Sequence, residues 1–478
     1  MTPYNYPSPR TTEYKKPTSI EDCLPQARLL AKKTVGRGAL GPIKKGDKIL
    51  IVTLADQDEY VKEAVTQALI EEGAEKVDFI FENELGEIEP RKFNVEEGWK
   101  EADSMENAPW DLSGAEFYSD IAKGLYNYVA KHAEYTGVFG GIARRSMVRL
   151  YMGENGHKFR NNWIFNNWEE FLSDANVYPD ELWTEIERKI IEPIGNASSV
   201  RITDPEGTYL EYDVTAEQAK RWQMTAWLAG HLFLDPLQAT TQEIARTVKI
   251  NLSPKVSPVF HNLKGVLAGT SNHMGYIPRI KLYFDKSRLV EVDGGGKYGD
   301  LIREMMDKYK NVQWPGYPDK GFFWFCDAVV CTLVKAFRRK SDLFKSYWRL
   351  ANVTERSRAG IFHLGFGSRQ HGEEYLNYAK SNNLPTGHIH VHNYFATYEI
   401  KIRGTDYWYK IVDKGWVTAM DDPEIRALAV KYGEPEDLLS YDWVPPLPGI
   451  NCAGDYLKDY APDPIAYLKK RMSENQPI

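Results

Sequence analysis

The first third of the chain contains a continuous apolar run, which is followed by apolar residues at helical spacing. Residues 48–54, KILIVTL, are typical of a buried strand. Residues 58–72 carry apolar side chains on one helical face and end at Gly73, and a second strand is predicted over 77–81. This order predicts a βαβ unit with a parallel sheet. The turn after the first strand, LADQDEY, lacks the glycines of a dinucleotide site or a P-loop.

After Ala197 the pattern changes to short segments in which apolar and polar residues alternate. Residues 199–214 predict a hairpin that turns at 204–207, and residues 279–296 predict a second hairpin that turns at 285–287. A helix is expected directly after the second hairpin. Further strands are predicted over 248–252, 265–270, 361–366, 389–402 and 407–412.

The 478 residues therefore divide into an arm and two domains. Residues 1–22 contain four prolines and predict an extended arm, of a kind that often wraps a neighbouring subunit. Residues 23–196 predict an α/β domain with a parallel sheet. Residues 197–478 predict a β-rich, α+β catalytic domain with a C-terminal tail.

Composition excludes several classes of protein. Hydrophobic residues make up 42% and charged residues 27%, as in globular proteins. The net charge of -7, without a long Lys/Arg tract, argues against binding nucleic acid. The apolar stretch 322–334 is interrupted by Asp327 and is shorter than the ~20 residues that span a bilayer. With no secretory signal and four irregularly spaced cysteines, we expect a cytoplasmic protein with reduced thiols.

The histidines give the strongest functional signal, because five of the ten fall between His363 and His392. In a strand, His388, His390 and His392 share one face, and neighbours on that face are ~6.5 to 7 Å apart. Two such imidazoles can bind one ion at ~2.0 to 2.1 Å, and His363 in IFHLGFG can supply a ligand from another strand. The alternative is a set of histidines hydrogen-bonded on a sheet face; their clustering favours a metal.

Other residues are candidates for the pocket around this metal. His231, in WLAGHLFLDP, is either a core histidine or an acid/base group. Aromatic residues near these segments suit a flat aromatic substrate, although each alone is more typical of a core. The residues expected to contact substrate are Trp227, Phe366, Tyr394 and His388.

Four segments carry a resemblance to a known superfamily. They are GVLAGTSNHMGYIPRIKLYFDKSRLVEVDGGGKYGDLIREMM, IFHLGFG, HIHVHNYFATYEIKI and the following DKGWV. The chain resembles the superfamily that joins thermophilic metallo-aminopeptidases of the aminopeptidase T type to 2,5-dihydroxypyridine 5,6-dioxygenases. The resemblance implies that His363, His390 and His392 bind the metal, with His392 in place of an aspartate. It also implies a homo-oligomer with its site between an α/β and a β-rich domain.

Two stretches favour the dioxygenase branch. The peptidases resemble one another in two glutamates that complete a two-metal site. In the corresponding stretches this chain has NLSPKVSPVF, which contains no carboxylate, and WRLANVTERS, which contains only Glu355. A mononuclear site is therefore favoured over a two-metal site. By resemblance Glu217 is a candidate acid/base group, although Thr215 could cap a helix that starts there. Glu373, Glu374 or Glu399 could restore a carboxylate ligand.

The preferred hypothesis is a mononuclear non-haem iron(II) dioxygenase that cleaves a hydroxylated, nitrogen-containing aromatic ring with O₂. The first alternative is a zinc-dependent hydrolase of aminopeptidase or amidase type, because three neutral imidazoles around zinc form a hydrolytic centre. The second alternative is a non-catalytic protein that binds a metal or a small molecule.

Overall fold

The computed structural model describes residues 4–34, 36–53, 57–85, 124–140, 158–165, 167–225, 227–228, 231–234, 262–272, 275–339, 355–367, 373–385 and 388–478. The chain forms two compact units. One contains the described residues from 13 to 180, and the other contains residues 4–12 and the described residues from 181 onward. The predicted strand over 248–252 lies outside the described residues. Within the described ranges, no helix is long and apolar enough to cross a membrane.

The unit that contains residue 48 is built on a parallel sheet, as predicted. Its strand order is β3-β2-β4-β5. The helix α2 (Glu59–Glu71) begins at Asp58, whose side chain accepts a hydrogen bond from the Tyr60 backbone N–H at 3.0 Å. The strands are β2 (Lys48–Thr53), β3 (Lys76–Phe81), β4 (Gly137–Gly140) and β5 (Phe159–Asn161).

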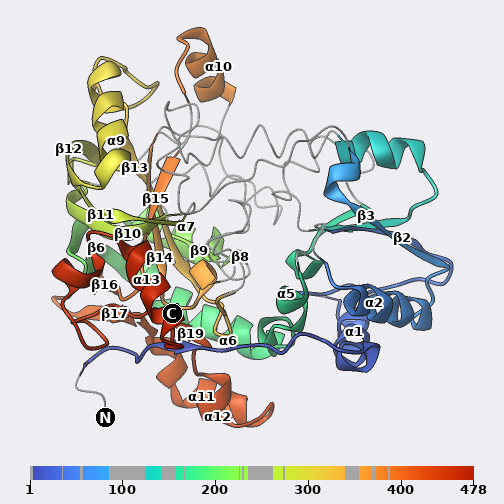
Figure 1. Ribbon diagram of the computed structural model, residues 1–478. Helices are drawn as coiled ribbons and strands as arrows, with labels where there is room; N and C mark the ends of the chain where they lie inside the picture. The colour runs from blue at the N-terminus through green and yellow to red at the C-terminus, as the bar shows by residue number, and fades with distance from the viewer. Residues whose placement is uncertain are drawn as a thin grey trace. The chain divides into compact units, whose positions relative to one another are not determined.

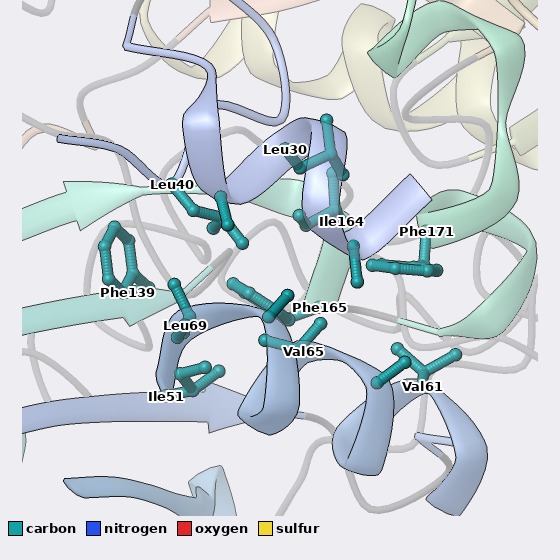
Figure 2. Close-up of a cluster of buried hydrophobic side chains, with 14 of the residues drawn as sticks. Leu30, Leu40, Ile51, Val61, Val65, Leu69, Phe139, Ile164, Phe165 and Phe171 are labelled. Carbon is teal, nitrogen blue, oxygen red and sulfur yellow. The ribbon is translucent and has the colours of Figure 1, made fainter. Parts of the chain in front are cut away.

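The core of this unit lies between the sheet and two helices. The apolar face of α2 packs with α1 (Leu24–Lys32) against Ile51 of β2 and Phe139 of β4 (Figure 2). The short helix α5 (Trp168–Leu172) adds Phe171 to the same cluster. These side chains are at most a few per cent exposed, so burial of apolar surface holds the βαβ unit together.

The second unit is built on a curled antiparallel sheet, in agreement with the predicted β-rich fold (Figure 1). Among the described residues the sheet has thirteen strands, in the order β15-β14-β13-β12-β11-β10-β7-β6-β16-β17-β18. In addition, β9 pairs with β13, and β8 pairs with β9. The first strands are β6 (Ala197–Asp204), β7 (Thr208–Asp213), β8 (Trp227–Leu228), β9 (His231–Phe233), β10 (Lys264–Asn272) and β11 (Gly275–Asp285). The remaining strands are β12 (Arg288–Gly294), β13 (Trp324–Cys331), β14 (Phe362–Gly367), β15 (His388–Asn393), β16 (Thr397–Ile402), β17 (Trp408–Asp413) and β18 (Trp416–Val417).

Helices pack against this sheet. The helix α9 packs against β11 and β12, and α13 packs against β11 (Figure 1). Both predicted hairpins, β6–β7 and β11–β12, are confirmed, as is the helix after the second one. The helices are α6 (Asp180–Ile191), α7 (Ala216–Thr225), α9 (Gly296–Lys308), α10 (Glu373–Ser381), α11 (Pro423–Val430), α12 (Pro435–Leu438) and α13 (Pro464–Ser473).

The prediction of one strand over residues 389–402 is wrong. The segment forms β15 and β16, separated by a turn at 394–396. The Tyr394 carbonyl accepts a hydrogen bond from Arg358 Nη2 at 2.6 Å, and the Phe395 backbone N–H donates to Asp204 Oδ2 at 3.1 Å. These bonds to distant segments satisfy backbone groups that a continuous strand would pair with its neighbours.

The N-terminal arm pairs with a late segment of the same chain. β1 (Arg10–Thr11) is antiparallel to β19 (Trp443–Val444). Ahead of it, the Tyr6 ring packs against Phe395 with centroids 5.5 Å apart, and the Pro7 carbonyl accepts a hydrogen bond from Asn451 at 2.9 Å. The described part of the arm is thus ordered by its own chain.

Candidate metal centre

The predicted histidines come together on two neighbouring strands. β14 and β15 are antiparallel, and His363 lies directly opposite His392, while Gly365 lies opposite His390. Because side chains alternate along a strand, these positions share one face of the sheet. The opposite face of the two strands is apolar and carries Leu364, Phe366, Ile389 and Val391.

All three imidazoles are buried. The exposed fraction is 4% for His363 and His390 and 0% for His392. The ring centroids of His363 and His392 are 4.4 Å apart, and those of His363 and His390 are 6.0 Å apart. Gly365 has no side chain and therefore leaves space opposite His390. The histidines of the HxH strand and of IFHLGFG thus lie on the same face of the sheet.

A backbone carbonyl fixes the orientation of His363. Its Nε2 lies 2.8 Å from the Arg356 carbonyl oxygen. A carbonyl only accepts hydrogen bonds, so Nε2 carries the proton and the lone pair is on Nδ1. Metal-binding histidines commonly donate their other ring N–H to a carbonyl in this way. The Cys331 thiol is 3.5 Å from the same Nε2.

A serine contacts His392 from a third strand. Ser271 of β10 is fully buried, and its Oγ is 3.3 Å from Nδ1 of His392. A metal would therefore be bound through Nε2 of His392. Ser271 reaches this position at an irregularity of the β10–β11 register between Gly269 and Ser271.

The imidazole nitrogens are suitable ligands for a divalent transition metal. The positions of the rings do not by themselves define which nitrogens would bind it. Imidazole is a common ligand of iron, zinc and related ions. Two nitrogens bound to one such ion at tetrahedral angles are about 3.4 Å apart. The rings of His363 and His392 instead lie tilted at 31° to each other, with their centroids 4.4 Å apart. Across the described ranges, no three His, Cys, Asp or Glu side chains have the arrangement of a metal site.

A pair of buried carboxyl groups lies near β10. Glu206 Oε1 accepts hydrogen bonds from Thr270 Oγ1 and the Tyr456 hydroxyl, both at 2.8 Å. Asp204 Oδ1 accepts from the Glu206 backbone N–H at 2.9 Å. Burial raises the pKa of Asp204 to about 7 and that of Glu206 to about 8, because the charged form loses its hydration. Thr270 of this cluster directly precedes Ser271 in the sequence.

Two residues expected to contact substrate pack in aromatic clusters. Phe366 has the opposite strand parity to His363, and its ring packs 6.0 Å from Phe284 and 5.6 Å from Phe323. Tyr394 is 1% exposed and packs at 5.7 Å against Trp443. Strand parity thus separates Phe366 from the histidines.

The two candidate carboxylates that the structure describes pair with arginines. Glu217 lies in the first turn of α7, and its side chain is 81% exposed and paired with Arg221 at 2.8 Å. Glu399 lies on β16, 4.0 Å from Arg201, and not on the strand of His390. The structure therefore brings neither carboxylate to the histidines.

Other candidates are described only by their backbone. The side chains of Trp227, His231 and His388 lie outside the described part of the structure, as do those of Glu373 and Glu374. The backbone of His231 in β9 is in register with Cys331 of β13, whose thiol contacts His363. Its acid/base role stays a prediction.

Comparisons with known proteins find several similar solved structures. No family model matches the sequence, and no curated protein matches it. The 2,5-dihydroxypyridine dioxygenase from Pseudomonas putida KT2440 is 12% identical, with a TM-score of 0.42 over 84% of this chain and 98% of that one. Wild-type AmpT from Thermus thermophilus is 12% identical, with a TM-score of 0.41 over 83% and 99%. A 2,5-dihydroxypyridine dioxygenase is one of the two enzyme types that the sequence resemblance named.

Proposed function

We propose that the three-histidine cluster binds one divalent transition metal and that the chain is a metal-dependent enzyme. The observation that supports this proposal is that His363, His390 and His392 are buried on one face of two paired strands. The ring centroids of His363 and His392 are 4.4 Å apart, and those of His363 and His390 are 6.0 Å apart. Imidazole is a common protein ligand of divalent transition metals. A shared metal would explain why three histidines occupy this face.

The preferred reaction is the cleavage of a hydroxylated, nitrogen-containing aromatic ring by O₂. Iron(II) bound to histidines with open positions supplies redox chemistry toward O₂ and an electron-rich ring. The Arg356 carbonyl holds the His363 ring, and Ser271 holds the His392 ring. The apolar opposite face of β14 and β15 anchors both strands in the core, so that bulk water is kept from the histidines.

The alternative is zinc-dependent hydrolysis of a peptide or amide. This reaction is supported by the donor set itself, because the three candidate ligands are neutral imidazoles. Such a set around zinc lowers the pKa of a bound water toward neutrality. His231 is the proposed acid/base group in this case.

Metal analysis of protein purified without a His-tag separates these reactions. About one iron per chain after anaerobic purification, with O₂ consumption on addition of 2,5-dihydroxypyridine, is the expected result. Zinc with turnover of a chromogenic amide supports the hydrolase. A chain that takes up neither metal contradicts the proposal and favours a non-catalytic binding protein.

The ligand assignment is tested by His390→Ala. Loss of one imidazole is expected to reduce bound metal at least tenfold while the circular dichroism spectrum stays unchanged. His132→Ala is the matched control, because His132 is partly exposed, stacks on Tyr128 and belongs to the other unit. Equal metal content in both variants contradicts the assigned ligand set.

A further inference from the structure

Arg358 is a fully buried arginine that lies between the η7 turn (Glu355–Ser357) and β14. Its Nη2 donates a hydrogen bond to the Tyr394 carbonyl at 2.6 Å. Three aromatic rings pack around the guanidinium, with distances of 4.8 to 5.9 Å from its central carbon to the ring centroids. These rings belong to Tyr441, Trp443 and Phe395. The side chain is thus enclosed by the protein and acts on its neighbours within the fold.

The positive charge of Arg358 has no counter-charge among the residues that the structure describes. None of the ion pairs between described residues includes it, and its Nε and Nη1 are buried without a hydrogen bond to a described residue. Burial lowers the pKa of the guanidinium to about 10, so it stays protonated at neutral pH. Burying an unpaired charge costs folding free energy, and cation–π contacts offset only part of this cost. A costly buried residue of this kind favours a role in function over a role in stability alone.

Arg358 connects the two segments that hold the ends of the histidine strands. The segment before β14 contributes the Arg356 carbonyl, whose oxygen lies 2.8 Å from Nε2 of His363. The turn after β15 contributes the Tyr394 carbonyl, two residues after His392. In the ladder between the two strands, His363 lies directly opposite His392. The hydrogen bond of Arg358 therefore fixes the two segments relative to each other beside this pair of histidines.

The turn that accepts this hydrogen bond is packed closely against the segment DKGWV, residues 413–417. The Gly415 backbone N–H donates to the Ala396 carbonyl at 2.8 Å. A Cβ atom at Gly415 would lie 2.5 Å from the Tyr394 carbonyl oxygen, and a Cβ atom at Gly360 would overlap the Gly415 carbonyl oxygen. Three backbone segments thus approach one another at the end of β15, so a shift of the turn would also displace this strand.

We propose that Arg358 is a positioning residue for the metal centre, whose hydrogen bond to the turn after β15 holds His392 and His363 in the relative position in which they share one metal. A guanidinium suits this role, because it is planar, stays charged and stacks between aromatic rings while it donates to a carbonyl. A hydrogen bond from a charged donor is also stronger than one from a neutral donor. This inference rests on the proposed function, because it assigns Arg358 to the proposed metal site.

Two substitutions at position 358 test this role. Arg358→Lys keeps the charge, but its nitrogen ends one bond short of Nη2 and reaches the Tyr394 carbonyl only if the turn moves. We expect the dissociation constant of zinc(II) to rise about threefold in this variant and about tenfold in Arg358→Met, which has no donor. The constants are measured on the full chain by competition with a chelator. The absorption bands of the cobalt(II)-loaded protein depend on ligand geometry and are expected to shift in both variants.

Arg338→Met is the matched control. Arg338 is also buried, but it packs on Trp443 at 4.3 Å and donates a hydrogen bond to the Tyr276 hydroxyl. The control is expected to keep the zinc(II) dissociation constant and the cobalt(II) spectrum of wild type, whatever its effect on unfolding by urea. Equal rises of the dissociation constant in the two methionine variants contradict the assignment to Arg358 and indicate a general effect of removing a buried arginine.

The lysine variant keeps the inference testable if Arg358→Met does not fold. A zinc(II) dissociation constant and a cobalt(II) spectrum equal to those of wild type in Arg358→Lys overturn the inference, whatever the methionine variant does. Failure of the proposed function is distinguished by wild type itself. Wild type that binds neither zinc(II) nor cobalt(II) contradicts the proposed metal centre, whereas metal binding that is unchanged by the substitutions contradicts only the role of Arg358.

Discussion

At the scale of single residues, the histidine cluster is held by partners that are distant in sequence. Ser271 and His392 are 121 residues apart, and their side-chain contact at 3.3 Å lies in the buried interior. A hydrogen bond of this kind selects the tautomer of the ring and fixes its orientation. Ser271 is therefore a positioning residue for His392.

Ser271→Ala is expected to weaken metal binding about tenfold without unfolding the protein, because the His392 ring loses the partner that orients it. Ser271→Thr keeps the hydroxyl and is expected to retain most of the affinity. The measurement is the dissociation constant of the metal by competition with a chelator. Equal constants for wild type and the alanine variant contradict the positioning role.

Alternation along the strands is the local signal from which the sequence places His390 and His392 on one face, and β15 has this alternation. The same rule separates Phe366 from His363, because an odd and an even position point to opposite faces. The contacts of Ser271 and Arg358 could not be predicted in this way. They depend on the pairing of strands far apart in sequence, and a single chain carries no local signal for such pairing.

At the scale of elements, close packing between β10 and β15 holds the histidine strand in place. A Cβ atom at Gly269 would lie 2.6 Å from Val391 Cγ1 and 3.5 Å from the His392 carbonyl oxygen. Asn393 Nδ2 donates to the Ala268 carbonyl at 2.8 Å and connects the same two strands. Glycine at position 269 is therefore required by the close approach of β15.

Gly269→Ala is expected to lower the free energy of unfolding by about 1 to 3 kcal/mol, because the added methyl group overlaps a side chain with little freedom to move. Adding Val391→Ala removes the overlapping atom. The double variant should then be less destabilised than the sum of the two single variants, as measured by urea unfolding. If the changes in the free energy of unfolding of the two single variants add up to that of the double variant, positions 269 and 391 are not in steric conflict.

The βαβ unit and both hairpins were predictable because their signals are local. Each depends on apolar periodicity and on a turn such as Asp204–Gly207, where Gly207 has a φ of +118°. The break between β15 and β16 has no glycine or proline to mark it. It is made by Asp204 and Arg358, which bind the turn from distant segments.

At the scale of the whole molecule, the buried carboxyl pair links stability to pH. Asp204 and Glu206 connect the β6–β7 hairpin to the turn after β15 and to the segment that contains Tyr456. Their pKa values are raised in the folded protein, so the protonated forms favour folding. This contribution is complete below the ordinary carboxyl range and is lost as the pH rises from about 4 to about 8.

Glu206→Gln is expected to reduce the loss of folding stability with rising pH. An amide stays neutral and can still accept hydrogen bonds from Thr270 and Tyr456. At pH 8 the variant should be more stable than wild type by about 1 to 3 kcal/mol. Urea unfolding at several pH values between 5 and 8 gives the measurement. Glu424→Gln changes a carboxylate that is 77% exposed and serves as the control. A variant with the wild-type slope contradicts the linkage.

The antiparallel pair β1–β19 has a consequence for the order in which the chain folds. Thr12 donates its backbone N–H to the Asp442 carbonyl, 430 residues away. Closing so long a loop is entropically costly, and during synthesis the partner strand does not yet exist. Until residues around 444 leave the ribosome, the nascent arm can bind a chaperone or pair with the late strand of another copy. Pairing with another copy would yield a domain-swapped dimer.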